Sequence, residues 1–185
     1  MSSFFELVKN RQSVRKYSDK KVEREKIEMC IEAARLSPSA CNSQPWTFIV
    51  IDEPELSQKV AKATYSPIIA FNKFVKYSTV MIVIVIEKPK NIAKIGDAIK
   101  DREFPLIDIG IAAEHFCLQA TDLGIGTCML GWFNEKKVKD LLKIPKNKRV
   151  GLCISMGYPE DNYKQRLKIR KETSHMCRYN SYLEN

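Results

Sequence analysis

Apolar residues recur every three or four positions in several parts of the chain, which is the spacing of one face of an α-helix. The segment 22–35 is typical, because its apolar residues from Ile27 to Ala34 keep this spacing and Pro38 lies beyond its end. The segment 108–123 is the clearest, and its small, apolar surface indicates a place in a core or an interface. The pattern predicts helices over residues 3–10, 22–35, 54–63, 108–123 and 135–142.

Runs of β-branched and other apolar residues predict the strands of a sheet. The run from Val80 to Ile86 has no polar alternation, so we expect a central strand with both faces buried. Helices and strands are mixed without an internal repeat, which predicts one α/β or α+β domain around about four strands. The predicted strands are 47–51, 80–86, 126–133 and 149–156, while 65–77 is ambiguous and 89–106 is expected to be a mobile connection.

The composition is that of a globular domain. The chain has 185 residues, 44% of them hydrophobic, and no apolar run approaches the ~18 residues of a membrane span. Its first residues do not resemble a signal peptide, so we expect a cytoplasmic protein. Six scattered cysteines without a CxxC pair and two isolated histidines predict reduced thiols and no metal site.

The net charge of +9 favours anionic ligands. Nucleic-acid binding would need a basic stripe or a known module, and neither is present, so no nucleic-acid partner is expected. The glycine-rich loops of nucleotide-binding proteins and the GxSxG nucleophile motif are also absent. Basic residues gather only in the segments 11–21 and 164–171, near opposite ends of the chain. The tertiary structure determines whether both segments can contact one small anion.

The N-terminal basic segment is suited to a terminal phosphate. In an extended conformation, Arg11, Ser13 and Arg15 share one side, and guanidinium groups offer paired donors to phosphate oxygens. Arg166, Lys168 and Arg170 alternate in the same way and form a second basic arm. Taken alone, the first segment is better explained as a solvated basic turn, and the second is equally well explained as a solvated basic tail.

Two other segments are suited to a flat heterocycle. The loop SPSACNSQPW, residues 37–46, offers the amides of Asn42 and Gln44, which suit a ring edge that alternates donors and acceptors, such as the pyrimidine of a flavin. Two prolines stiffen it, which limits the ordering cost of binding. Gly131 would allow close backbone approach to a flat ligand. The alternatives are a capped helix-to-strand turn and a glycine that ends a strand.

In chain order, five segments together resemble the nitroreductase family of FMN-dependent oxidoreductases. They are RQSVRKY, EAARLSPSACNSQPWTFIVI, DIGIAAEHFCLQATDLGIGTCMLGWF, VGLCISMGYP and RLKIRK. The resemblance implies one α+β domain over residues 1–185, with a mainly antiparallel sheet of four to five strands flanked by helices. It also implies an intertwined homodimer with two FMN molecules at its interface and a C-terminal arm, about 160–185, docked on the partner. An aperiodic arm of this length fits docking on a partner chain.

The resemblance also implies roles for particular residues. The phosphate and ribityl chain of FMN would be held by Arg11, Gln12, Ser13, Arg15 and Arg170. The isoalloxazine would lie against Leu130 and Gly131, with Asn72 and Lys73 near its pyrimidine side. The partner subunit would contribute Pro38, Ser39, Ala40, Asn42 and Gln44.

By the same resemblance, NADH or NADPH transfers hydride to flavin N5, and a nitroaromatic, quinone or similar acceptor then takes its place in a ping-pong cycle. No dedicated catalytic side chain is expected. The residues 88–106 lack the long inserted helices of larger members, which leaves the acceptor and the preferred donor open. Two alternatives remain: a specialised reaction such as dehalogenation or flavin fragmentation, and a flavin-binding redox sensor with little turnover.

Overall fold

The structure is a computed structural model that describes residues 3–66, 68, 70–88 and 103–183. Its described strands form one antiparallel sheet in the order β1-β2-β4-β3. The α+β class and the antiparallel sheet expected from the sequence are confirmed. The strands are β1 (Trp46–Ile51), β2 (Val80–Ile86), β3 (Gly126–Leu130) and β4 (Arg149–Gly157). The helices are α1 (Phe4–Asn10), α2 (Arg24–Arg35), α3 (Pro54–Ala61), α5 (Phe104–Asp122), α6 (Glu135–Leu142) and α7 (Thr173–Met176).

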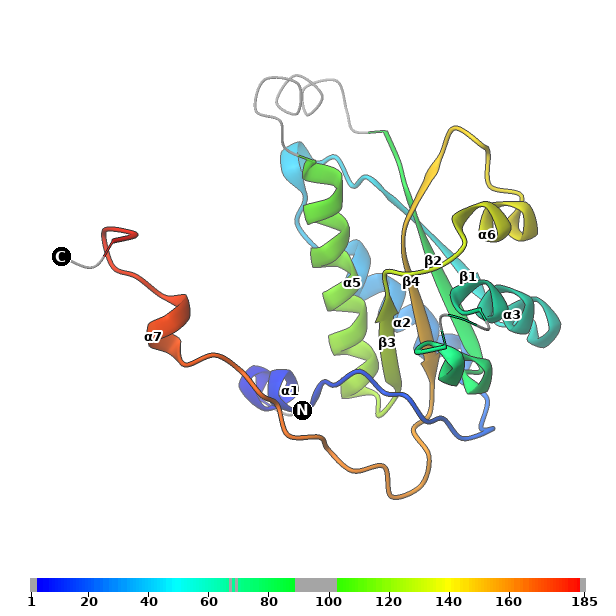
Figure 1. Ribbon diagram of the computed structural model, residues 1–185, viewed down its shortest axis with the longest axis horizontal. Helices are drawn as coiled ribbons and strands as arrows, with labels where there is room; N and C mark the ends of the chain where they lie inside the picture. Colours follow the sequence, from blue (N-terminus) through cyan, green and yellow to red (C-terminus); the bar gives the residue numbers. More distant parts are fainter. Residues whose placement is uncertain (1–2, 67, 69, 89–102, 184–185) are drawn as a thin grey trace.

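Strand β2 lies inside the sheet and is buried on both faces, as its unbroken apolar run predicts. Its even-numbered side chains, such as Ile82, pack in one core with α2 and α5. Its odd-numbered side chains, such as Val83, pack in a second core with α3 and α6. Figure 1 shows the resulting three layers, with α2 and α5 on one face of the sheet and α3 and α6 on the other.

Several boundaries differ from the predicted ones, each for a local reason. Helix α5 begins at Phe104, four residues before its predicted start, because Pro105 is favoured in a first helical turn. Strand β3 ends at Leu130, where pairing with β4 stops, so the predicted continuation to Phe133 is wrong. The ambiguous segment contains a short 3₁₀ helix over Lys73–Tyr77. The expected mobile connection at 89–106 lies mostly outside the described residues.

The C-terminal arm leaves β4 and follows the N-terminal segment before it turns away from the sheet (Figure 1). Its outer part, which includes α7, exposes large apolar side chains, with Tyr179 85% and Tyr182 90% exposed. No described helix has the length and apolar character needed to cross a bilayer.

Candidate functional site

The N-terminal basic segment runs along the outer edge of β3. Ser13 forms a parallel bridge with Thr127, and the Val14 N–H donates to the Thr127 carbonyl at 2.9 Å. This approach requires Gly126, because a β-carbon there would lie 2.6 Å from Cγ2 of Val14. The glycine therefore allows the segment that contains Ser13 to lie against the sheet.

Arg11 is oriented by the long helix α5. Its Nε donates to Oε1 of Glu114 at 3.1 Å, an ion pair in which both side chains are partly exposed. The terminal nitrogens of Arg11 make no hydrogen bond to another described residue. One edge of the guanidinium is thus fixed while its other donors stay available to a ligand.

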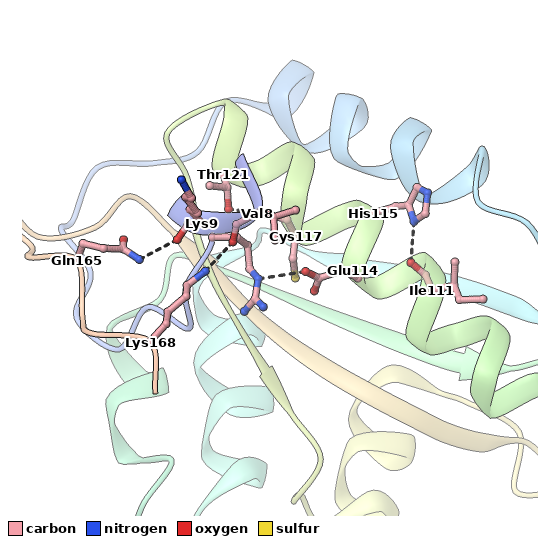
Figure 2. Close-up of polar contacts among 10 residues, drawn as sticks. Val8, Lys9, Ile111, Glu114, His115, Cys117, Thr121, Gln165 and Lys168 are labelled. Atoms are coloured by element: carbon pink, nitrogen blue, oxygen red, sulfur yellow. Dashed lines mark hydrogen bonds and ion pairs between the residues drawn. The ribbon is translucent and has the colours of Figure 1, made fainter. Parts of the chain in front are cut away.

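The C-terminal arm brings the second basic segment to the first. Figure 2 shows two of the contacts, from Gln165 to Lys9 and from Lys168 to Val8. Residues about 150 positions apart in sequence therefore meet, as one shared anion site requires. The hydrogen bonds are Arg15 N–H to Tyr163 Oη (3.2 Å), Gln165 Nε2 to Lys9 O (3.2 Å), Arg166 N–H to Gln12 Oε1 (3.1 Å) and Lys168 Nζ to Val8 O (2.6 Å).

The two basic segments enclose a small cavity of about 200 Å³, and no carboxylate of the described part of the chain lines its wall. Loss of hydration, together with repulsion by Arg11 and Arg170, lowers the pKa of Lys168. Positive charge is therefore crowded here, and a bound anion would relieve the repulsion. The cavity is lined by Arg11, Gln12, Ser13, Arg15, Arg166, Leu167, Lys168 and Arg170. The structure thus brings together all five residues expected at the FMN phosphate.

The end of β3 offers an open surface beyond this cavity. The side chain of Leu130 is buried in the second core, so only its backbone can face a ligand. Gly131 is exposed, and no other part of the described chain lies within 4 Å of a β-carbon placed there. Gly131 lies about 13 Å along the strand direction from Thr127, the partner of Ser13.

The loop 37–46 is held by hydrogen bonds to α5 and does not line the Arg11 cavity. The Ala40 N–H donates to the carboxylate oxygens of Asp108 on α5, at 3.1 and 3.2 Å. Cys41, Asn42 and Gln44 all have positive φ, near +50°, which is costly for side chains other than Asn and is typical of functional loops. Pro38, Ser39, Ala40, Asn42 and Gln44 do not line the Arg11 cavity of their own chain.

The two loop amides also bond to each other. Nε2 of Gln44 donates to Oδ1 of Asn42 at 2.8 Å, and the Gln44 N–H donates to Oγ of Ser39 at 2.9 Å. The loop is therefore ordered by its own polar groups before any ligand is present. Their expected contact with a flavin edge remains a prediction.

Helix α5 presents an apolar groove on the side away from the sheet. The groove has a volume of about 860 Å³ and is lined by residues of α1, α2 and α5, including Phe4, Gly110 and Ile111. Two of the lining side chains are largely exposed, Ile107 at 55% and Phe4 at 72%. This surface fits the sequence expectation that the long apolar helix lies in a core or an interface.

His115 and three buried cysteines contribute to the packing of the fold rather than to a site. Nδ1 of His115 lies 2.9 Å from the Ile111 carbonyl within α5 (Figure 2). Burial raises the pKa of the Cys30, Cys117 and Cys153 thiols to about 12. Among the described residues, no group of three or more His, Cys, Asp or Glu side chains is placed to hold a metal ion.

Comparison with known proteins identifies the family of the chain. The nitroreductase family model matches residues 8–158. A protein of Archaeoglobus fulgidus, provisionally named an NADH dehydrogenase/NAD(P)H nitroreductase, is 33% identical over 87% of this chain and 88% of its own length.

Two solved structures share the fold. A nitroreductase family protein from Clostridium novyi NT is 34% identical, with a TM-score of 0.74 over 89% of each chain. A structure described as an FMN-dependent nitroreductase from Clostridium difficile R20291 is 28% identical, with a TM-score of 0.78 over 97% of this chain and 100% of the other. The chain belongs to the nitroreductase family. This confirms the resemblance and the expected enzyme class, an FMN-dependent NAD(P)H oxidoreductase.

Proposed function

We propose that the protein works as a homodimer that uses NADH or NADPH to reduce nitroaromatics, quinones or similar acceptors by a ping-pong cycle. One observation supports this most strongly. Two basic segments from opposite ends of the chain enclose one carboxylate-free cavity, and that cavity lies beside the strand that ends at the open Gly131. The arrangement has a receptor for phosphate at one end and a surface for a flat ring at the other.

At the phosphate end, Arg11 and Arg15 supply charge-assisted hydrogen bonds, which are the strong ones in proteins. Ser13 adds a hydroxyl donor beside them, and Gln12 fixes the C-terminal arm by accepting from the Arg166 N–H. Arg170 completes the cationic wall. The residues present therefore fit the phosphate of FMN.

At the ring end, the backbone of Leu130 and Gly131 supports one face of the isoalloxazine. The loop residues Pro38, Ser39, Ala40, Asn42 and Gln44 come from the partner subunit, because their own chain holds them away from the Arg11 cavity. Association across the apolar groove of α5 brings the two half-sites together. The C-terminal arm docks on the partner with its outer, exposed part.

FMN, when bound, supplies the two-electron chemistry of the reaction. The chain orients FMN and places its arginines beside the phosphate. Positive charge on the protein also stabilises the negative charge that develops on the flavin ring on reduction. No general acid or base is assigned to the protein, because water can deliver the protons.

Initial-rate kinetics test this function. Rates measured at several fixed concentrations of a quinone while NADH or NADPH varies should give parallel double-reciprocal lines, the pattern of a ping-pong cycle. Intersecting lines would contradict the cycle. Bound flavin without turnover of either donor would instead favour a redox sensor, and turnover restricted to a halogenated or flavin substrate would favour a specialised reaction.

A further inference from the structure

Another cavity lies between the 3₁₀ helix at Lys62–Thr64, which follows α3, the 3₁₀ helix at Lys73–Tyr77 and the start of α6. Its volume is about 610 Å³, within the range of small-molecule sites. A hydrogen bond from the Asn134 N–H to the Ala63 carbonyl, 2.7 Å long, joins two of its walls. The lining residues are Lys62, Ala63, Tyr65, Ser66, Ala70, Lys73, Trp132, Asn134 and Lys137.

Among the described residues, the charged ones that line this cavity are all lysines. Lys62, Lys73 and Lys137 come from three different parts of the chain, and none of them forms an ion pair with a described residue. Glu135 is the acidic residue nearest to Lys137 along the sequence, but it has other partners. Its Oε1 accepts from Lys139 and from the Val150 N–H. Unpaired ammonium groups on three walls give the cavity a positive potential.

An aromatic surface accompanies this charge. The rings of Trp132 and Phe71 meet edge to face, with their centroids 6.0 Å apart. Asn72, only 6% exposed, holds this arrangement by donating to the carbonyls of Thr64 (3.1 Å) and Trp132 (3.3 Å). Tyr65 is a further aromatic lining residue. The cavity therefore combines a fixed aromatic wall with cations, which suits a ligand that has both a ring and a negative group.

The cavity adjoins the place proposed for the flavin ring. Trp132 directly follows Gly131, and the guanidinium of Arg15 lies over the ring of Phe74 at 5.8 Å, next to Lys73. A ligand in the cavity would therefore lie beside the isoalloxazine, and the cavity shares none of its lysines with the phosphate cavity.

We propose that this cavity selects substrates that have both an aromatic ring and a negative group, with Lys62 and Lys137 as its specificity-determining residues. The inference rests on the proposed function, because it assigns the substrate class of the same site. The negative group has two sources with the same chemistry: the additional phosphate of NADPH, or an acid group on the acceptor.

Matched substrate pairs and matched lysine variants test the proposal. The pairs are NADPH with NADH, and 4-nitrobenzoate with 4-nitrobenzyl alcohol. The variants are Lys62→Gln and Lys137→Gln, which remove one charge each. The controls are Lys59→Gln, on α3 just before Lys62, and Lys136→Gln, next to Lys137 on α6, because neither Lys59 nor Lys136 lines the cavity.

The wild type should prefer, in one pair, the member that has the additional negative group. Each cavity variant should then lose about three- to tenfold in kcat/KM for that member, the effect of one partly exposed charge, with less than about a twofold change for the member that lacks this group. The preference should also weaken as salt is added. The pair that responds identifies the source of the negative group.

Three results would overturn the inference. They are equal kcat/KM for the two members of both pairs, losses no larger than those of the control variants, and loss of bound flavin in the cavity variants. The last would assign these lysines to the cofactor.

Failure of the proposed function has a different signature, namely no bound flavin and no turnover of any substrate. In that case, calorimetric titration with NADP⁺, NAD⁺ and 4-nitrobenzoate decides the inference directly. Binding of an anion that both cavity variants weaken would support it, and absence of such binding would overturn it.

Discussion

Gly126 faces Val14 so closely that a β-carbon at position 126 would lie 2.6 Å from Val14 Cγ2 and 2.7 Å from its Cβ. The contact couples the edge of the sheet to the segment that contains Arg11, Ser13 and Arg15. A residue with no chemistry of its own thus determines where three proposed phosphate ligands lie.

Gly126→Ala should therefore weaken both the fold and the cofactor site. Relief of the clash must move the backbone at Val14, and such overpacking costs about 1–3 kcal/mol. We expect a lower free energy of unfolding in urea and a higher Kd for FMN. An unchanged Kd for FMN would show that the position of this segment does not control binding.

Gly131→Ala, in contrast to Gly126→Ala, should weaken FMN binding without changing the stability of the fold. No other part of the described chain lies near a β-carbon at this position, so the stability of the flavin-free protein should change by less than about 0.5 kcal/mol. If the isoalloxazine lies against this glycine, the added methyl group occupies its space, and the Kd for FMN should rise at least about tenfold. Equal affinity in the variant and the wild type would place the ring elsewhere.

Arg11→Ala and Arg15→Ala should each lose FMN without unfolding. A hydrogen bond to a charged group contributes about 1.5–3 kcal/mol, so the Kd for FMN should rise by about 10- to 100-fold. Lys9→Ala is the control, because the Lys9 ammonium pairs with Glu6 on the surface and does not line the cavity. Retention of flavin by both arginine variants through gel filtration, with native circular dichroism, would contradict the phosphate assignment.

The apolar groove of α5 predicts an obligate dimer. Light scattering should give twice the chain mass of 21.3 kDa. Ile107→Asp places a charge on the exposed apolar side of α5, where desolvating it would oppose association, so this variant should become monomeric and lose flavin. A folded wild-type monomer that still binds flavin would refute a shared site.

The buried thiols predict a loss of stability at high pH. Burial raises the pKa of Cys30, Cys117 and Cys153 from 9.0 to about 12. Between these values the thiols ionise only in the unfolded chain, which therefore binds fewer protons than the folded one. The free energy of unfolding should be unaffected by these thiols below about pH 9 and fall above it, by up to about 1.4 kcal/mol per pH unit for each thiol.

Urea unfolding from pH 8 to pH 11 measures this dependence, and Cys153→Ala provides its control. The variant removes one of the three thiols, so its free energy of unfolding should fall less steeply with pH than that of the wild type. The same slope in both proteins would assign the pH dependence to other groups.

The sequence predicted the elements whose signals are local. The apolar run at Val80–Ile86 predicted β2 with its observed bounds, because burial on both faces leaves no other pattern. The spacing of apolar residues predicted α5, but not its first turn, which precedes the periodic part. The order of the strands was not predicted, since it depends on pairing between distant segments.

For the candidate site, too, local patterns proposed some residues, while residues that act through tertiary contacts were missed. The spacing of basic residues proposed Arg11 as a phosphate ligand, and the family resemblance added Arg170, but neither could show that Arg166 and Lys168 hold the arm against residues 8–13 through backbone contacts. Both also missed Glu114 and Gly126, because their roles arise only from tertiary contacts. The glycine pair at 124 and 126 was visible in the sequence, but it did not match a nucleotide-binding loop.

An anaerobic absorbance spectrum of the purified protein shows whether the chain binds a working flavin. We expect the visible bands of bound flavin and their bleaching when NADH or NADPH is added, followed by recovery when a quinone or nitroaromatic is supplied. Absence of flavin bands even after FMN is added, or bands that neither donor bleaches, would contradict this expectation.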